Sequence, residues 1–166
     1  MPKIIENLES RLIEEAKKQI EEAGYGVMTI RSVAKACGVG VGTVYNYFPS
    51  KEALLATYML ADWNRCVDAI QVVSTYSDTA VPVLRCMYDQ LVSFANLHRN
   101  IFTDDAAAAS FAGSFSRYHI LLRSQLAQPL RKFCGDDFTP DFVAEALLTW
   151  SMAGKSFDDI CGIFFT

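Results

Sequence analysis

Basic and hydrogen-bonding side chains gather in one short stretch of the sequence, TIRSVAKACGVGVGTVYNYFPSK, which spans residues 29–51. Residues 27–51 contain three basic residues, Arg31, Lys35 and Lys51, and no acidic residue. The whole chain of 166 residues carries a formal net charge of −4. One uncompensated basic patch on an acidic chain suits a protein that binds nucleic acid there and keeps its other surfaces away from it. The chemistry that these residue types indicate is contact with phosphates and base edges.

Patterns for catalysis or metal binding do not stand out. The sequence has no GxSxG, HExxH or Walker-type loop, and the GVGVG run at 38–42 lacks the glycine spacing of a nucleotide site. Neither His98 nor His119 has an acidic partner at metal or triad spacing, and the five cysteines show no CxxC spacing. We therefore expect no enzyme activity, no cofactor and no metal site. An enzyme is the alternative of another class, and it would need a cavity with convergent, pKa-shifted groups.

The spacing of small and apolar residues in the same stretch predicts a helix-turn-helix, in which two short helices cross around a tight turn. Ala34 provides the small residue at the crossing, and Gly38 provides the positive φ at the turn. The second helix is expected to end near residue 37 and the third to span about 41–48. The apolar residues expected to pin the two helices together are Val33, Cys37, Val39, Val44 and Tyr47.

Local signals place the ends of the neighbouring helices. Residues 4–23 have the apolar spacing of one amphipathic helix, which Gly24 is expected to end. Thr29 is expected to cap the second helix, without a full capping box, because no Glu or Gln follows three residues later. Pro49 stops the third helix, and Ser50 is expected to cap the fourth.

The run GVGVGTVYNYFPSKEALL, with the preceding Thr-Ile-Arg and Ala-Lys-Ala-x-Gly-Val patterns, resembles the DNA-binding domain of the tetracycline-repressor (TetR) family of bacterial transcriptional regulators. The resemblance covers roughly residues 8–60, about a third of the chain. It implies an all-α protein with a three-helix DNA-binding domain over 1–50 and a helical effector-binding and dimerisation domain over 51–166. It also implies that the third helix lies in the major groove of an operator.

The roles of individual residues follow from this resemblance. Tyr45 and Asn46 match groove-facing positions, Tyr47 and Lys51 match phosphate contacts, and Arg31 matches a contact at the groove edge. Because Gly40 and Val41 stand where the family often has Ser followed by Lys or Arg, direct readout is expected to depend on Arg31, Tyr45 and Asn46. The DNA-binding residues implied are Thr29, Arg31, Gly40, Val41, Gly42, Thr43, Tyr45, Asn46, Tyr47 and Lys51.

The rest of the chain shows helical rather than strand patterns. Long helices are expected over 51–76, 79–99 and 114–133, and Asp104–Asp105 is expected to cap a short helix. Thr139-Pro140-Asp141 has the residue order of a helix start, with the hydroxyl as cap.

The final stretch, FVAEALLTWSMAGKSFDDICGIFF, is expected to break near Gly154 and is too apolar on too many sides for a lone surface helix. Pairing with a second copy of the chain, together with residues 114–133, would bury the excess. The resemblance also implies a homodimer through the last two long helices, which would set two recognition helices about one DNA turn apart on a palindrome.

Aromatic side chains in the larger region predict a pocket for a small apolar or aromatic effector, although packing in a core is the favoured explanation for each of them taken singly. The alternative is a TetR-like adaptor whose second domain binds a partner protein. The candidate effector-binding residues are Tyr58, Trp63, Tyr88, Phe94, His98, Phe102, Phe111, Tyr118, His119 and Trp150. Since the sequence has no signal-peptide pattern and no run of 18 apolar residues, we expect a cytoplasmic protein with no membrane contact.

Overall fold

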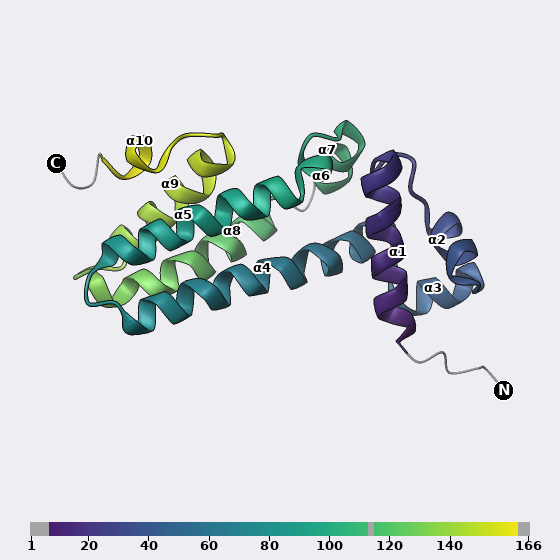
Figure 1. The fold of residues 1–166 in the computed structure, drawn as a ribbon, viewed down its shortest axis with the longest axis horizontal. Helices are drawn as coiled ribbons and strands as arrows, with labels where there is room; N and C mark the ends of the chain where they lie inside the picture. Colours follow the sequence, from purple (N-terminus) through teal and green to yellow (C-terminus); the bar gives the residue numbers. More distant parts are fainter. Residues whose placement is uncertain (1–6, 113–114, 163–166) are drawn as a thin grey trace. The chain divides into compact units, whose positions relative to one another are not determined.

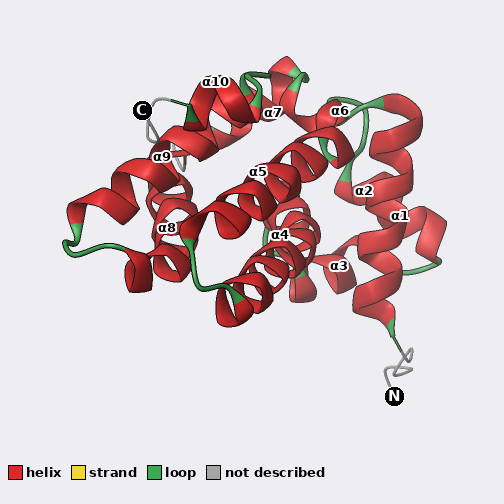
Figure 2. Ribbon diagram, turned by 60° about the vertical axis from the view of Figure 1, so that its left-hand side comes forward, coloured by secondary structure: helices red, strands yellow, loops and turns green. Residues whose placement is uncertain are grey.

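The computed structural model describes residues 7–112 and 115–162, and within them every regular element is a helix (Figures 1 and 2). The all-α fold class predicted from the sequence is confirmed, because the apolar residues recur at helical spacing and strand patterns are lacking. The elements are α1 (Leu8–Ala23), α2 (Ile30–Cys37), α3 (Val41–Tyr47), α4 (Lys51–Tyr76), α5 (Ala80–Leu97), α6 (Arg99–Phe102), α7 (Asp105–Phe111), α8 (Phe115–Ala127), the 3-10 helix η1 (Gln128–Phe133), α9 (Phe138–Met152) and α10 (Phe157–Cys161).

The chain divides into two compact units. Unit 1 comprises residues 1–61 and 98–112, and unit 2 comprises residues 62–97 and 113–166. The two units therefore share α4, with residues 51–61 in one and 62–76 in the other. This division follows contacts within one copy of the chain, so the functional domains predicted over 1–50 and 51–166 stay a prediction.

The core of unit 1 is formed where α1 lies across the helix-turn-helix. The buried face of α1 repeats at steps of four residues, and α2 and α3 close over it from the other side. Full burial of a leucine, isoleucine or valine side chain stabilises a fold by about 1.5–3 kcal/mol. The core residues contributed by the first three helices are Leu8, Leu12, Ala16, Ile20, Ile30, Val33, Ala34, Cys37 and Val44.

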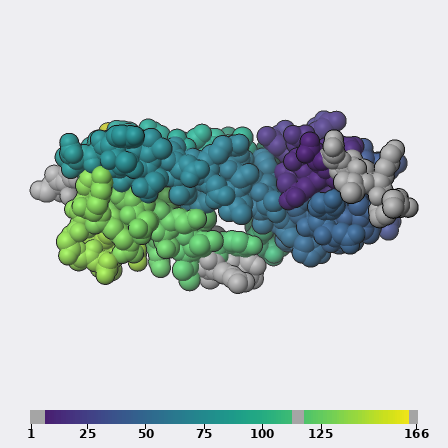
Figure 3. Space-filling model, turned by 90° about the horizontal axis from the view of Figure 1, so that it is seen from below, coloured from purple at the N-terminus to yellow at the C-terminus, as the bar shows by residue number. Residues whose placement is uncertain are grey.

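Unit 2 is a helical bundle in which α9 packs against both α8 and α5. Trp63 donates its indole N–H to Gln125 Oε1 at 2.7 Å, and the Ser74 hydroxyl donates to the Pro129 carbonyl at 2.9 Å. These bonds join residues of α4 to α8 and η1, whose surfaces lie side by side in the space-filling view (Figure 3). Pro129 has no N–H to donate, which accounts for the change from α-helix to 3-10 helix at this point.

Most of the predicted helix positions are confirmed, and one start is wrong. The helix over 51–76 is observed with the same bounds, Asp104 caps α7, and Gly154, at φ 80°, follows the end of α9. The predicted helix over 114–133 is α-helical only to Ala127. The predicted cap Thr139 instead lies inside α9, which begins at Phe138, because Asp136 accepts the Thr139 N–H at 2.7 Å. The predicted start of the first helix at 4 lies outside the described residues.

Candidate nucleic-acid interface

The start of α2 is held by side chains on both sides of its first turn. Thr29 has extended backbone angles, and its hydroxyl accepts the Ser32 N–H at 3.0 Å. The Ser32 hydroxyl accepts the Thr29 N–H at 3.1 Å, so a reciprocal capping box is present. The sequence-based expectation that the box is incomplete is wrong, because a serine at the third helical position takes the place of Glu or Gln.

The turn between α2 and α3 depends on Gly38. Its φ of 71° lies in the left-handed region, and its N–H donates to the Lys35 carbonyl at 3.2 Å while Val39 N–H donates to Ala34 at 3.0 Å. From α1, Arg11 donates to the Cys37 carbonyl at 3.2 Å and satisfies the last turn of α2. The tight turn at Gly38 predicted from the sequence is thus observed, and α1 supports it through Arg11.

Helix α3 contributes one fully buried residue, Val44, to the core of unit 1. Tyr45 is 50% exposed, Tyr47 is 46% exposed and Asn46 is exposed. The expectation that Tyr47 pins the helices together is wrong, since the neighbouring Phe48, just beyond the helix end, is buried instead. Most of α3 therefore faces solvent, which leaves its side chains available to another molecule.

The two glycines at the start of α3 keep its backbone open to solvent. A Cβ added to Gly42 would meet no atom within 4 Å, and one added to Gly40 would lie 3.9 Å from the Thr43 hydroxyl. Space at these positions permits close approach of a ligand to the backbone.

The basic side chains of the stretch differ in their surroundings. Arg31 and Lys35 are exposed on α2. Lys51 is half-buried: its ammonium donates to the Tyr25 carbonyl and lies 3.9 Å from the centre of the Tyr25 ring. Burial lowers the pKa of Lys51, although the Glu52 and Asp104 carboxylates oppose the shift. An ammonium has three N–H donors, and the bond to the Tyr25 carbonyl uses one of them. The ammonium could therefore still donate to a DNA phosphate, and that contact stays a prediction.

All ten predicted DNA-binding residues belong to unit 1, at the start of α2, along α3 and at the start of α4. Their roles toward DNA stay predictions. Seven are exposed, namely Thr29, Arg31, Gly40, Gly42, Tyr45, Asn46 and Tyr47, and three are half-buried, namely Val41, Thr43 and Lys51.

The predicted effector-binding residues are divided between the units. Tyr58, His98, Phe102 and Phe111 belong to unit 1, and Trp63, Tyr88, Phe94, Tyr118, His119 and Trp150 belong to unit 2.

Several of these aromatic residues pack on one another. The rings of Tyr58 and His98 meet edge to face at 4.9 Å, and those of Trp63 and Phe94 at 5.5 Å. Trp150, by contrast, is 51% exposed. A shallow depression of about 310 Å³ in unit 1 is lined by residues that were not predicted, Ile20, Glu21, Gly24, Asn100, Thr103 and Asp104. Effector binding by the ten residues stays a prediction.

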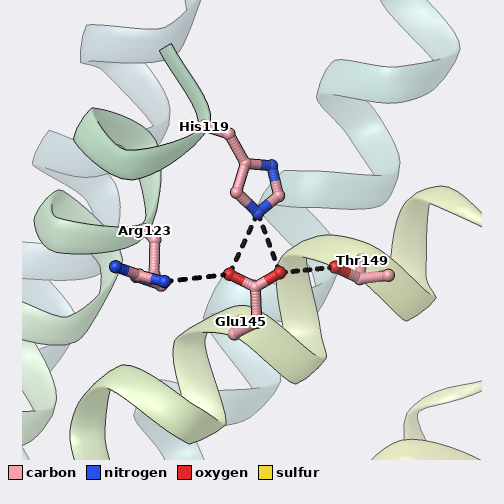
Figure 4. Close-up of polar contacts among 4 residues, drawn as sticks. All are labelled: His119, Arg123, Glu145 and Thr149. Atoms are coloured by element: carbon pink, nitrogen blue, oxygen red, sulfur yellow. Dashed lines mark hydrogen bonds and ion pairs between the residues drawn. The ribbon is translucent and has the colours of Figure 1, made fainter. Parts of the chain in front are cut away.

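His119 has an acidic partner that sequence spacing did not reveal. Its Nε2 lies 2.8 and 2.9 Å from the two carboxylate oxygens of Glu145, which also accepts from the Thr149 hydroxyl at 3.0 Å (Figure 4). Arg123 completes the cluster at 3.6 Å. Burial raises the pKa of Glu145, but the hydrogen bonds from His119 and Thr149 outweigh it and leave the pKa below its usual value. The pair joins α8 to α9 across 26 residues, a separation at which no sequence motif applies.

A metal site needs several ligand side chains close together, and a membrane span needs a long apolar helix. Among the described residues, no group of three or more His, Cys, Asp or Glu side chains is placed to hold a metal ion. Within the same part of the chain, no helix has both the length and the apolar character needed to cross a bilayer.

Comparison with known proteins gives matches for the N-terminal region in sequence and for most of the chain in fold. The family model described as bacterial regulatory proteins, tetR family, matches residues 12–58. The chain is 34% identical over 71 residues to an uncharacterized HTH-type transcriptional regulator, YuxN, of Bacillus subtilis, covering 43% of this chain and 24% of that protein. It is 35% identical over 68 residues to the HTH-type transcriptional repressor KstR of Rhodococcus jostii, covering 36% and 32%. The chain thus spans about a quarter to a third of the length of these relatives.

Solved structures are similar over nearly the whole chain. The putative transcriptional regulator SCO7518 of Streptomyces coelicolor superimposes with a TM-score of 0.67 at 17% identity, covering 95% of this chain and 98% of that one. Likeness at this level of identity concerns the fold, and it extends the N-terminal match to the helical region that follows.

Proposed function

Since the chain belongs to the tetR family of bacterial regulatory proteins, we propose that it is a ligand-responsive repressor that binds a palindromic operator as a homodimer. The observation that carries this proposal is the exposure of α3. A seven-residue helix with a single buried residue adds little to its own core, so its outward face serves contact with another molecule. The absence of acidic residues from 27–51 makes DNA the fitting partner.

Base reading would come from three exposed side chains. Asn46 has the amide that pairs bidentately with an adenine edge, Arg31 has the guanidinium that pairs with guanine, and Tyr45 lies beside Asn46 on α3. The half-buried Val41 offers a methyl group to a thymine methyl. Each bidentate pair would contribute about 1–3 kcal/mol of discrimination.

Homodimerisation is supported by the apolar surface of α8 and α9. Large hydrophobic side chains exposed together on a monomer mark a protein interface, and the contacts between His119, Glu145 and Arg123 hold the two helices to each other before any partner arrives. A second copy using the same face would form a twofold dimer with two α3 helices. Among the described residues of α8 and α9, the exposed large hydrophobic side chains are Tyr118, Ile120, Leu121, Phe138, Phe142, Trp150 and Met152.

The response to a ligand would be a shift between two populations. An effector acts only through the difference between its affinities for the DNA-binding dimer and for a dimer whose recognition helices are wrongly spaced. The aromatic pairs around Trp63 and Tyr58 suit a small apolar or aromatic effector. Because the same side chains pack closely on one another, an adaptor that binds a partner protein is the second candidate. A repressor of either kind acts on the chromosome, so we propose a cytoplasmic location.

Selection from a pool of random duplexes tests the proposal and identifies the operator in the same experiment. The purified chain is expected to enrich an inverted repeat whose half-sites lie about 10 base pairs apart, centre to centre. Footprinting should then protect both half-sites, and a candidate apolar ligand should release the DNA. Enrichment of a single, non-repeated site would contradict the dimer, and a pool that never converges would contradict sequence-specific binding. Release by a protein from the same cell, and by no small molecule, would favour the adaptor.

A further inference from the structure

A chain of hydrogen bonds runs from α1 to the capping box at the start of α2. The side-chain amide of Gln19 donates through Nε2 to Glu15 Oε1 at 2.7 Å. The Ser32 hydroxyl lies 2.5 Å from Gln19 Oε1 and 2.8 Å from the Thr29 carbonyl, with one proton to donate to either. The same hydroxyl accepts the Thr29 N–H at 3.1 Å. Gln19 is thus the link between the outer face of α1 and the first turn of α2.

The carboxylate of Glu15 gives this chain its direction. An ionised carboxylate only accepts hydrogen bonds, so Gln19 must turn its NH₂ group toward Glu15 and its carbonyl oxygen toward Ser32. The Ser32 hydroxyl then has an acceptor on α1, and its lone pairs stay available to the Thr29 N–H. The usual residue at this position of a capping box is Glu or Gln, whose side chain is longer than that of serine. In this protein the bond to Gln19 on α1 orients the Ser32 hydroxyl.

The first turn of α2 also contains residues that the proposed function places against DNA. Thr29 and Arg31 are exposed, whereas Ser32 and Gln19 are half-buried behind them. Resting on the proposed DNA-binding function, we propose that Gln19 is a positioning residue for DNA binding. It lies on α1, touches Ser32 rather than the ligand, and holds Thr29 toward the DNA backbone and Arg31 toward the groove edge, where a guanidinium lies near phosphates as well as bases.

Substitution of Gln19 should weaken binding to every DNA sequence. Gln19→Ala leaves Ser32 without its acceptor on α1, and loss of one ordered hydrogen-bond link corresponds to about a 3- to 10-fold loss of affinity. If the Arg31 guanidinium loses a contact with a phosphate as well, the slope of log affinity against log salt becomes shallower by about one. Amide hydrogen exchange at residues 29–32 should become faster, while exchange in unit 2 stays unchanged.

A polarity swap separates positioning from simple helix stability. Gln19→Glu alone sets two carboxylates one turn apart and should bind as weakly as Gln19→Ala. The double variant Glu15→Gln/Gln19→Glu has the wild-type net charge and reverses the bond between positions 15 and 19: the amide at 15 donates to the carboxylate at 19, which also accepts the Ser32 hydroxyl. It should recover affinity, salt slope and slow exchange together. Gln71→Ala, at an exposed glutamine of α4 in unit 2, is the matched control and should bind like the wild type.

The experiment measures binding to a random-sequence duplex of roughly 30 base pairs, long enough for two half-sites, at several salt concentrations. Wild-type protein that binds no duplex at all would overturn the proposed function. Wild-type protein that binds, with Gln19→Ala matching it in affinity and salt slope, would overturn the positioning role alone. A swap variant that melts like the wild type but binds as weakly as Gln19→Ala would overturn it too, since the hydrogen-bond order would then be irrelevant.

Discussion

The exposed faces of α3 in unit 1 and of the α8–α9 pair in unit 2 differ in kind. On α3 the outward residues are polar or small, with Asn46, Gly42 and the hydroxyl-bearing Tyr45. On α9 they are large and apolar: Phe138 is 73% exposed and stacks on Phe142 at 5.8 Å. Hydrogen-bonding groups suit a partner that stays hydrated, such as a DNA groove, whereas exposed rings suit a partner that excludes water. The two surfaces thus suit two different classes of macromolecule.

The largest effect is expected from a charge on the apolar face. Phe142→Asp would bury a carboxylate in the proposed dimer, and we expect the dimer dissociation constant to rise by at least about 100-fold. Analytical ultracentrifugation measures this directly. Val72→Asp is the matched control, because Val72 is 58% exposed on α4 of unit 2 and lies off α8 and α9. A Phe142→Asp protein that dimerises as tightly as the control would place the interface elsewhere.

Unit 1 should lose stability in acid through His98. This side chain is 1% exposed, and burial, with a smaller contribution from the Lys17 ammonium, lowers the pKa of His98 to about 4. Between about pH 6.5 and 4 the unfolded chain binds a proton that the folded protein excludes, so stability is complete above this window and falls as the pH drops through it.

The expected loss from pH 7 to pH 5 is about 2 kcal/mol, measured by urea unfolding. His98→Leu should remove that part of the pH dependence. An unchanged difference between the two pH values in this variant would show that other groups cause the acid sensitivity.

Two glycine substitutions should change stability in opposite directions. Gly38→Ala forces a Cβ into the left-handed region at φ 71° and should destabilise the protein by about 1 kcal/mol. Gly42→Ala meets no neighbouring atom and should stabilise α3 by about 0.5–1 kcal/mol. If DNA approaches the α3 backbone at this point, Gly42→Ala will nevertheless bind DNA more weakly. Unimpaired binding would remove Gly42 from the interface.

The smallest effect concerns Lys51. Lys51→Ala should weaken binding to all sequences about equally and lower the salt slope by about one if the ammonium reaches a phosphate. Its contacts with Tyr25 suggest a competing role within unit 1. A variant with lower thermal stability and an unchanged salt slope would assign Lys51 to packing rather than to DNA.

Helix positions were predictable from the sequence because they depend on local signals. The apolar spacing and the Ser50 cap gave α4 its bounds, and the Ser50 hydroxyl does accept the Ala53 N–H at 3.1 Å. The capping role of Ser32 was missed because only Glu or Gln was expected at that position, and its bond to Gln19 was missed because Gln19 lies 13 residues earlier on another helix. The His119–Glu145 pair was missed for the same reason, over 26 residues.

The sequence also could not show that residues 98–112 pack with the N-terminal helices in unit 1. Asp104 was predicted as a cap of α7, and it is one, but its carboxylate also accepts the Gly26 N–H at 3.3 Å. That bond spans 78 residues and ties the segment 98–112 to the turn after α1. No periodicity or capping signal carries information over such a separation, because it arises only when the chain has folded.

The reading role of α3 is tested most directly by Asn46→Ala on the selected operator and on a random duplex. The account predicts a loss of about 1–3 kcal/mol in affinity for the operator, no change for random DNA, and an unchanged dimer. Asn64→Ala, at an exposed asparagine of α4 in unit 2, should leave both affinities as they are. Equal losses on operator and random DNA would contradict base reading by α3.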